Sequence, residues 1–242
     1  MANAYLAEIK AEVLKLSRMP EFAIPTLILP VMFFTLFGVI IPGSRDNAPY
    51  LLSTFGVFAV MGPALFGFGA GVAQERERGW LTLKRAVPAP ASALLVAKTT
   101  ATILIASVSL AAIYAVAAFA ADVSLPAAVW LGLLLVHVLS AIPFVLIGLA
   151  LGFVFGANAA VAVANILYLG MAVLGGLWMP VSIFPRIMGQ IAQVLPSFHL
   201  AEIALSISGA AGEKDMLGHI LATLVITAIA AGLALLAWAR QR

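Results

Sequence analysis

The sequence predicts an all-α membrane protein with six transmembrane helices, and three observations support this prediction. Hydrophobic residues make up 64% of the 242 residues, and the mean hydropathy is +1.13, whereas a soluble domain is about 45–50% apolar. Only 10% of the residues are charged, compared with about 25% in a soluble domain. Several uncharged apolar segments reach the ~20 residues that a helix needs to cross a bilayer.

The composition also excludes several kinds of chemistry. The chain has no cysteine, so disulfides, thiol catalysis and thiolate metal sites are excluded. The net charge of +3 is too small to indicate nucleic acid as a partner. The first apolar run starts only near Phe22 and is long enough to span, so a cleavable signal peptide is not expected.

The chain starts with an amphipathic pattern over residues 1–19. At 100° per residue, Tyr5, Ile9 and Val13 fall on one apolar arc together with Leu6 and Leu16. Such a helix would lie in the membrane interface with its apolar face down. The alternative is an ordinary solvated cap on the first span.

One transmembrane domain, 1–242, is expected to contain all six spans. The predicted spans are 22–41, 51–73, 94–121, 127–155, 159–179 and 217–238. Pro25 and Pro30 are expected to kink the first span, and Asn158 is expected to mark a turn before the fifth. The fourth span is long, so it must tilt, bend at Pro143 or protrude. Lys98, near the start of the third span, is expected to snorkel to the nearby membrane surface.

Residues 180–215 differ from the spans. Pro180, Pro185 and Pro196 separate two apolar helical patterns, 187–195 and 198–207, and each is too short to cross a bilayer. We expect a re-entrant pair of helices or a lid on the far surface.

Glycines at four-residue spacing predict close helix packing within the membrane. One such pair is Gly67 and Gly71 in the second span, and the other stripe is Gly148, Gly152 and Gly156 at the end of the fourth.

Catalysis is not expected. The three histidines lack metal-ligand spacing, no GxxxxGK[ST] loop for phosphates is present, and no Asp, Glu, Lys or Arg falls near the middle of a span. His137 alone is ionisable and mid-span, which makes it a candidate for a polar pathway. A histidine bonded to the backbone of a neighbouring helix explains it equally well. A hydrolase using Ser140 beside His137 has no further support.

The cations are distributed unequally, and this predicts the orientation. Ten lie near one side: Lys10, Lys15, Arg18, Arg76, Arg78, Lys84, Arg85, Lys98, Arg240 and Arg242. The other side has Arg45, Arg186 and Lys214. The positive-inside rule then places both termini in the cytoplasm. The chain is expected to be a multi-pass protein of the inner or plasma membrane.

The stretch from Gln74 to Ser92, QERERGWLTLKRAVPAPAS, is the most charged part of the chain. We expect it to be a loop in water between the second and third spans. The longer segment ERERGWLTLKRAVPAPASALLVAK resembles the cytoplasmic loop in the membrane subunits of ABC exporters, the ABC-2-type permease family. The matching positions are Glu75, Glu77, Gly79, Leu81, Pro88 and Lys98. Trp80 stands where threonine is usual in the family, and Thr82 where glutamate is usual.

A second segment carries the same resemblance. GGLWMPVSIFPRIMGQIAQVLPSFHLAEIAL, Gly175 to Leu205, is similar to the family's glycine-containing fifth span, spaced prolines and Pro-aromatic-polar turn. The resemblance implies a pair of membrane subunits, identical or closely related, with separate ATPase subunits. Those ATPases would bind ATP and Mg, and this chain would bind no cofactor. The cargo would be an amphiphile such as a drug or a lipid-linked saccharide, moved outward.

The resemblance also implies that the charged loop docks on the ATPase. The predicted coupling residues are Glu75, Arg76, Glu77, Arg78, Gly79, Trp80 and Leu81. On this view, losing Glu75 alone is mild, losing Glu75 and Glu77 is worse, and losing Trp80 is comparable to losing both. A plain positive-inside anchor would explain the cations but not the two glutamates among them. Two other functions stay open, a self-contained carrier or channel and a non-transporting assembly subunit.

The predicted topology is testable by thiol labelling of intact cells. Because the chain has no cysteine, single cysteines at Ser44 and Gly212 should label from outside, whereas one at Ala89 should not. Labelling of Ala89 would contradict the predicted orientation.

Overall fold

The computed structural model is all-helical over the residues that it describes, 2–17, 20–43, 45–81, 83, 91–210 and 215–241. Side chains are described for 5–15, 26–43, 45–81, 83, 93–210 and 215–241. Several positions named above lie outside these residues: Thr82, Lys84, Arg85, Pro88, Ala89, Ser44, Gly212, Lys214, Arg18 and Arg242. The prediction of an all-α membrane protein is confirmed.

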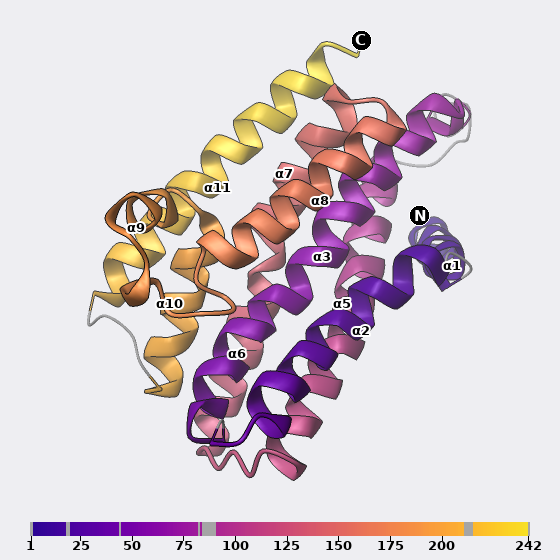
Figure 1. Cartoon of the computed structure of the whole chain (residues 1–242). Coiled ribbons are helices and arrows are strands. Elements are labelled where there is room, and N and C mark those ends of the chain that lie inside the picture. The colour runs from indigo at the N-terminus through magenta and orange to yellow at the C-terminus, as the bar shows by residue number, and fades with distance from the viewer. Residues whose placement is uncertain are drawn as a thin grey trace.

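Helices coincide with all six predicted spans. They are α2 with the π-helical turn η1 (Pro20–Thr35 and Leu36–Ile40), α3 (Ala48–Glu77), α5 (Ala91–Phe119), α6 with α7 (Ala127–Leu139 and Ala141–Val154), α8 (Ala157–Leu174) and α11 (Met216–Ala239). Five of these segments are long and apolar enough to cross a membrane, and Thr26–Ile40 is a shorter apolar helix. Both termini lie toward the same side of the view as the end of α3, opposite the turn that joins α2 to α3 (Figure 1).

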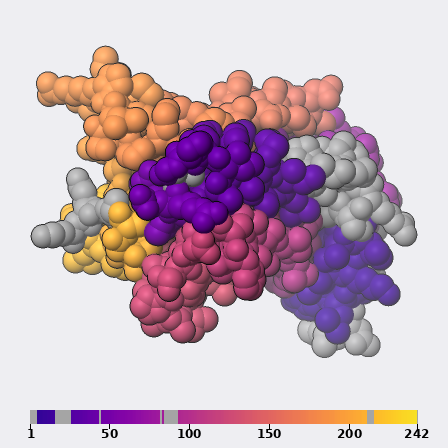
Figure 2. Space-filling model, turned by 60° about the horizontal axis from the view of Figure 1, so that its bottom comes forward, coloured from indigo at the N-terminus to yellow at the C-terminus, as the bar shows by residue number. Residues whose placement is uncertain are grey.

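Helix α3 forms the centre of the bundle. Most of its residues are buried, and it packs against α2, α5, α7, α8 and α10. Viewed from the end that carries the α2–α3 turn, this turn lies between the α5–α6 segment and the segment from α8 to α10 (Figure 2). At about 1.5 Å per residue the 30 residues of α3 extend about 45 Å, longer than the ~30 Å hydrocarbon core of a bilayer.

The fourth span is broken in the turn before Pro143. Helix α6 ends at Leu139, and α7 starts at Ala141. Proline has no N–H to donate to the carbonyl four residues earlier, here Leu139, and its ring crowds that carbonyl. The break therefore lies one turn before the proline that causes it.

Two predicted boundaries need correction. Helix α8 ends at Leu174, not at 179, because Gly175 and Gly176 follow and Gly176 adopts φ +75°, which favours glycine. The turn before α8 lies at Phe155 and Gly156, whereas Asn158 belongs to the first turn of the helix.

The segment before the last span contains two helices at a sharp angle. Helix α9 (Arg186–Ala192) and α10 (Pro196–Ser208) meet at 86° and could together make one broken span or a re-entrant pair. A short 3₁₀ turn, η3 (Val181–Ile183), precedes them. Helix α10 packs against α3, α6 and α11. This agrees with the two short helical patterns in the sequence.

The amino-terminal helix α1 (Ala2–Ser17) packs mainly on α5 and less on α2. Three residues of the predicted apolar arc, Tyr5, Ile9 and Val13, are partly buried. Glu12 is buried, whereas Leu6 is 65% exposed. A charged residue thus faces the bundle, and its partners are described below.

The second glycine stripe lies against the central helix. A Cβ added to Gly148 would lie 3.0 Å from the Ala64 carbonyl oxygen, and one added to Gly152 would lie 2.7 Å from that of Phe68. A Cβ added to Gly67 would lie 3.3 Å from Thr102 Oγ1 of α5, whereas one on Gly71 would meet nothing closer than 3.7 Å. The close approach of α7 to α3 therefore depends on Gly148 and Gly152.

We expect Gly152→Ala to reduce the stability of the protein, because its methyl group would push α7 away from a backbone carbonyl. Overpacking of this kind costs about 1–3 kcal/mol. The measurement is thermal denaturation in detergent. Gly170→Ala is the matched control, since a Cβ there meets nothing within 4 Å; equal stability of the two variants would contradict the packing argument.

Candidate functional site

Helix α3 continues beyond its apolar residues. It includes Glu75, Arg76 and Glu77, and it ends at Arg78. Glutamate and arginine favour helix, so the charges by themselves do not stop it. Gly79, at φ +73°, ends the helix, with its N–H donating to the Arg76 carbonyl oxygen. The prediction that these four charges form a loop is therefore wrong.

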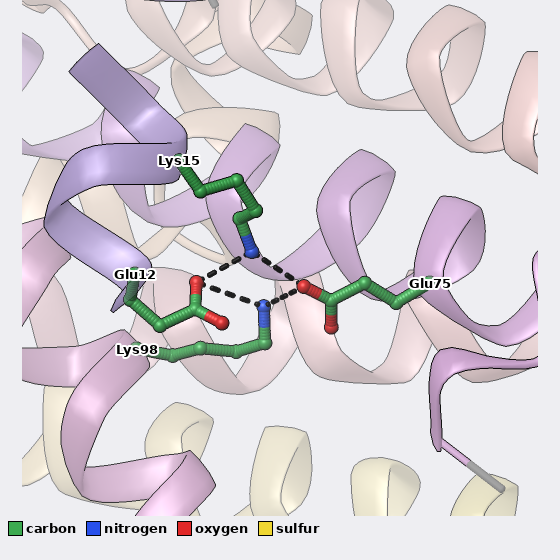
Figure 3. A network of polar contacts seen from close by, with 4 residues as sticks. All are labelled: Glu12, Lys15, Glu75 and Lys98. Atoms are coloured by element: carbon green, nitrogen blue, oxygen red, sulfur yellow. Dashed lines mark hydrogen bonds and ion pairs between the residues drawn. The ribbon is translucent and has the colours of Figure 1, made fainter. Parts of the chain in front are cut away.

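Four charged side chains from three helices form a closed ring beside this turn (Figure 3). Lys15 Nζ donates to Glu75 Oε1 and to Glu12 Oε2, each at 2.5 Å. Lys98 Nζ donates to Glu75 Oε1 at 2.7 Å and to Glu12 Oε2 at 3.4 Å. Each ammonium thus lies between two carboxylates. We call Glu12, Lys15, Glu75 and Lys98 the charge ring.

The charge ring is largely shielded from solvent. The side chains of Lys98, Glu12 and Glu75 are 4%, 5% and 12% exposed, and that of Lys15 is 35% exposed. Two positive and two negative groups sum to zero, and their mutual ion pairs offset part of the cost of burying each charge. The expected snorkelling of Lys98 is wrong, because its ammonium turns inward to the ring.

The two carboxylates keep Lys15 protonated. Burial alone would lower its pKa, but the charges of Glu75 and Glu12 and the hydrogen bonds to both raise the pKa above its ordinary value of 10.5. Lys15 is therefore an ammonium at neutral pH, as the ring requires.

The next two residues hold the junction between α7 and α8. The Arg76 guanidinium donates to the carbonyl oxygens of Phe153 and Phe155, the latter at 2.8 Å. Glu77 Oε1 accepts from the Ala157 N–H at 2.8 Å and so caps the start of α8. A Cβ on Gly156 would lie only 2.7 Å from that oxygen, so glycine is what lets Glu77 reach this helix end.

Beyond Gly79 the chain presents apolar side chains at the surface. Trp80 is 52% exposed and Leu83 is 61% exposed, while Leu81 is partly buried. The Leu83 N–H donates to the Gly79 carbonyl oxygen, which places these residues on one helical turn. Arg78, at the end of α3, is exposed as well. We call Arg78, Trp80 and Leu83 the exposed turn.

His137 lies far from this end and joins three helices. It is fully buried; its Nε2 lies 2.9 Å from the Ser53 carbonyl oxygen, and its Nδ1 lies 2.9 Å from the Tyr114 hydroxyl. A carbonyl only accepts, so Nε2 carries the proton and Nδ1 accepts from tyrosine. This is the bonded histidine that the sequence left open as the alternative. A Cβ on Gly56 would lie 2.1 Å from the ring, so that glycine makes room for the imidazole.

Sequence reasoning found Glu75 but missed its partners. It counted Lys15 only among the cations that predict the orientation, and it gave Glu12 no role. Their spacing of three residues on a helix does predict a local ion pair. It does not predict that the pair turns toward α3 and α5.

Comparison with known proteins agrees with this architecture. The profile of a family described as "ABC-2 type transporter" matches residues 3–208. This chain belongs to the ABC-2 type transporter family. A protein of Bacillus subtilis (strain 168), named "Putative transport permease YvfS", is 31% identical over 193 residues, covering 78% of this chain and 79% of that protein. The chain is therefore a transporter membrane subunit, a multi-pass permease. Its family match includes the charge ring and the exposed turn.

Arg76 and Arg78 allow a direct test of the α7–α8 clamp. We expect Arg76→Met to lower stability by about 1.5–3 kcal/mol, because two carbonyls lose a charged donor. Arg78 lies two residues further along the chain, and its side chain is exposed. Arg78→Met should therefore change stability by less than about 0.5 kcal/mol. Thermal denaturation in detergent measures both. A large effect of Arg78→Met, or none of Arg76→Met, would contradict the clamp.

Proposed function

We propose that this chain is the membrane subunit of an ATP-driven exporter and that a separate ATPase docks on the exposed turn. The observation that carries the proposal is the exposure of Trp80 and Leu83 directly after the last charged turn of α3. Large exposed apolar side chains beside a cation are typical of a docking surface. The preceding charges, Glu75 to Glu77, are used within the chain.

The charge distribution supports an energy source outside the chain. Within the described residues, the fully buried carboxylate and ammonium, Glu12 and Lys98, belong to the charge ring at one end of the bundle. His137, the buried histidine beside the first turns of α3, already has a partner on each ring nitrogen. An ion-driven carrier normally needs titratable groups near the midplane. ATP and Mg would be bound by the partner.

The orientation and the cargo complete the proposal. Both termini and the exposed turn lie on the cytoplasmic side of the inner or plasma membrane, following the cation distribution. A second membrane subunit, identical or closely related, completes the pathway. The cargo is an amphiphile, moved outward.

The proposal is tested by purification and reconstitution. In mild detergent the chain should co-purify with a protein that carries a phosphate-binding loop, and the pair in vesicles should move cargo only with ATP and Mg. The chain alone should not hydrolyse ATP. Cargo movement by the chain alone along an ion gradient would support the carrier instead.

Trp80→Ala should weaken ATPase co-purification by about 2 kcal/mol, or more than tenfold, since a packed aromatic is a frequent interface hot spot. Membrane abundance should not change, because the side chain is half exposed. Ile183→Ala, an exposed apolar residue on η3, is the control. Unchanged ATPase association would leave Trp80 as a membrane-interface anchor.

A further inference from the structure

The charge ring joins three segments that are far apart in the sequence. Glu12 and Lys15 come from α1, Glu75 from the last turn of α3, and Lys98 from the first part of α5. Glu75 Oε1 is the shared acceptor, since both ammoniums donate to it. Figure 3 shows the two lysine side chains converging between the two carboxylates. Within the described residues, removal of Glu75 would break both ion pairs that α3 contributes to the ring.

Helix α1 depends on this ring for its position. It turns a buried glutamate to the bundle and leaves Leu6 and Leu14 exposed. Only a few apolar side chains of α1, such as Ile9 and Val13, are partly buried. A buried carboxylate is stable only next to its cationic partners. The rotation of α1 about its axis is therefore set by where Lys98 and Glu75 lie.

The same turn of α3 leads directly into the exposed turn. Arg78 follows Glu75 by three residues, and Trp80 follows it by five. Arg76 and Glu77, between them, bind the α7–α8 junction. A displacement at the exposed turn therefore reaches α1 and α5 through the ring and α7–α8 through the clamp.

We infer that Glu75 is a positioning residue for energy coupling: through the charge ring it fixes α1 to α5 and to the base of the exposed turn, so that these parts move together. This inference rests on the proposed function, because it assigns the ring a role in transmitting movement from the docked ATPase. Glu75 does not contact the ATPase on this view. The expectation that losing Glu75 alone is mild is replaced by a severe loss of coupling.

The gentlest test removes only the charge of Glu75. Glu75 Oε2 is buried without a hydrogen-bond partner among the described residues, so glutamine can keep its oxygen on the ring and place its amide there. Glu75→Gln should reduce cargo exported per ATP hydrolysed by about tenfold, while ATPase co-purification stays within about twofold of the parent. Asp122→Asn is the control. It removes the exposed ion pair between Asp122 and Arg45, which lies outside the charge ring, and it should change neither export per ATP nor ATPase co-purification.

Charge exchange tests the ring as a unit. Glu12→Lys with Lys15→Glu keeps the ring neutral but places like charges side by side, and Glu75→Lys with Lys98→Glu does the same. The four substitutions together restore alternation. Each exchange alone should reduce export per ATP at least about fivefold, and the combination should recover most of it, since like charges in contact repel and opposite charges attract.

The position of α1 is measured without the ATPase. Because the chain has no cysteine, spin labels can be placed at Leu6 on α1 and Leu104 on α5, both exposed. Their distance distribution in membranes should be narrow in the parent and in the fourfold variant, and broad in Glu75→Gln and in each exchange. If no ATPase binds the parent chain, the proposed function fails, and this distance still reports whether the ring positions α1.

Three results would overturn the inference. The first is a Glu75→Gln variant whose distance and export per ATP match those of the parent. The second is a fourfold variant that accumulates but is no better than either exchange. The third is a Glu75→Gln variant that does not accumulate in membranes, because the ring would then serve folding alone.

Discussion

The sharing of one carboxylate oxygen between two ammonium groups determines how this end of the permease is built. Glu75 Oε1 lies 2.5 Å from Lys15 Nζ and 2.7 Å from Lys98 Nζ. If Glu75 were the only carboxylate here, it could neutralise only one of the two lysine ammonium groups. The other would be a buried unpaired charge, which is strongly destabilising. The second carboxylate, Glu12, balances the second ammonium. The neutrality of the ring therefore requires α1, α3 and α5 to meet at one place.

The contacts of the next two residues, Arg76 and Glu77, go with the packing of α7 against α3. Gly148 and Gly152 let the two backbones approach, since a Cβ at Gly152 would lie 2.7 Å from the Phe68 carbonyl oxygen. At this separation Arg76 and Glu77 reach the ends of α7 and α8. Three consecutive residues of one helical turn thus bind different helices, which is possible because side chains about 100° apart point in different directions. The apolar packing within the span and the polar contacts at its end are consequences of the same close approach.

The sequence predicted the fold well and the candidate site only in part. Hydropathy predicted helices in all six spans, because the lipid solvent forces long apolar segments to be helical. It did not predict where α3 ends, since the charges at 75–77 mark the limit of apolar residues, whereas Gly79 marks the limit of the helix. Local spacing also could not predict the ring, because Glu12 and Lys98 are 86 residues apart. Such partners are brought together by tertiary packing, and their sequence pattern alone is that of ordinary surface charges.

The placement of polar groups through the bundle bears on how the transporter is energised. Near the start of α3, His137 uses one ring nitrogen on the Ser53 carbonyl and the other on the Tyr114 hydroxyl, an arrangement that neutral imidazole satisfies fully. Protonation would turn the Nδ1 acceptor into a donor facing a hydroxyl whose proton already points at it, in a fully buried site. The histidine is therefore better suited to hold helices together than to carry a proton. Among the described residues, the fully buried carboxylate and ammonium, Glu12 and Lys98, lie instead at one end, beside an exposed apolar turn. A charged, anchored end beside an exposed apolar turn supports the proposal that a separate ATPase drives this permease from its surface.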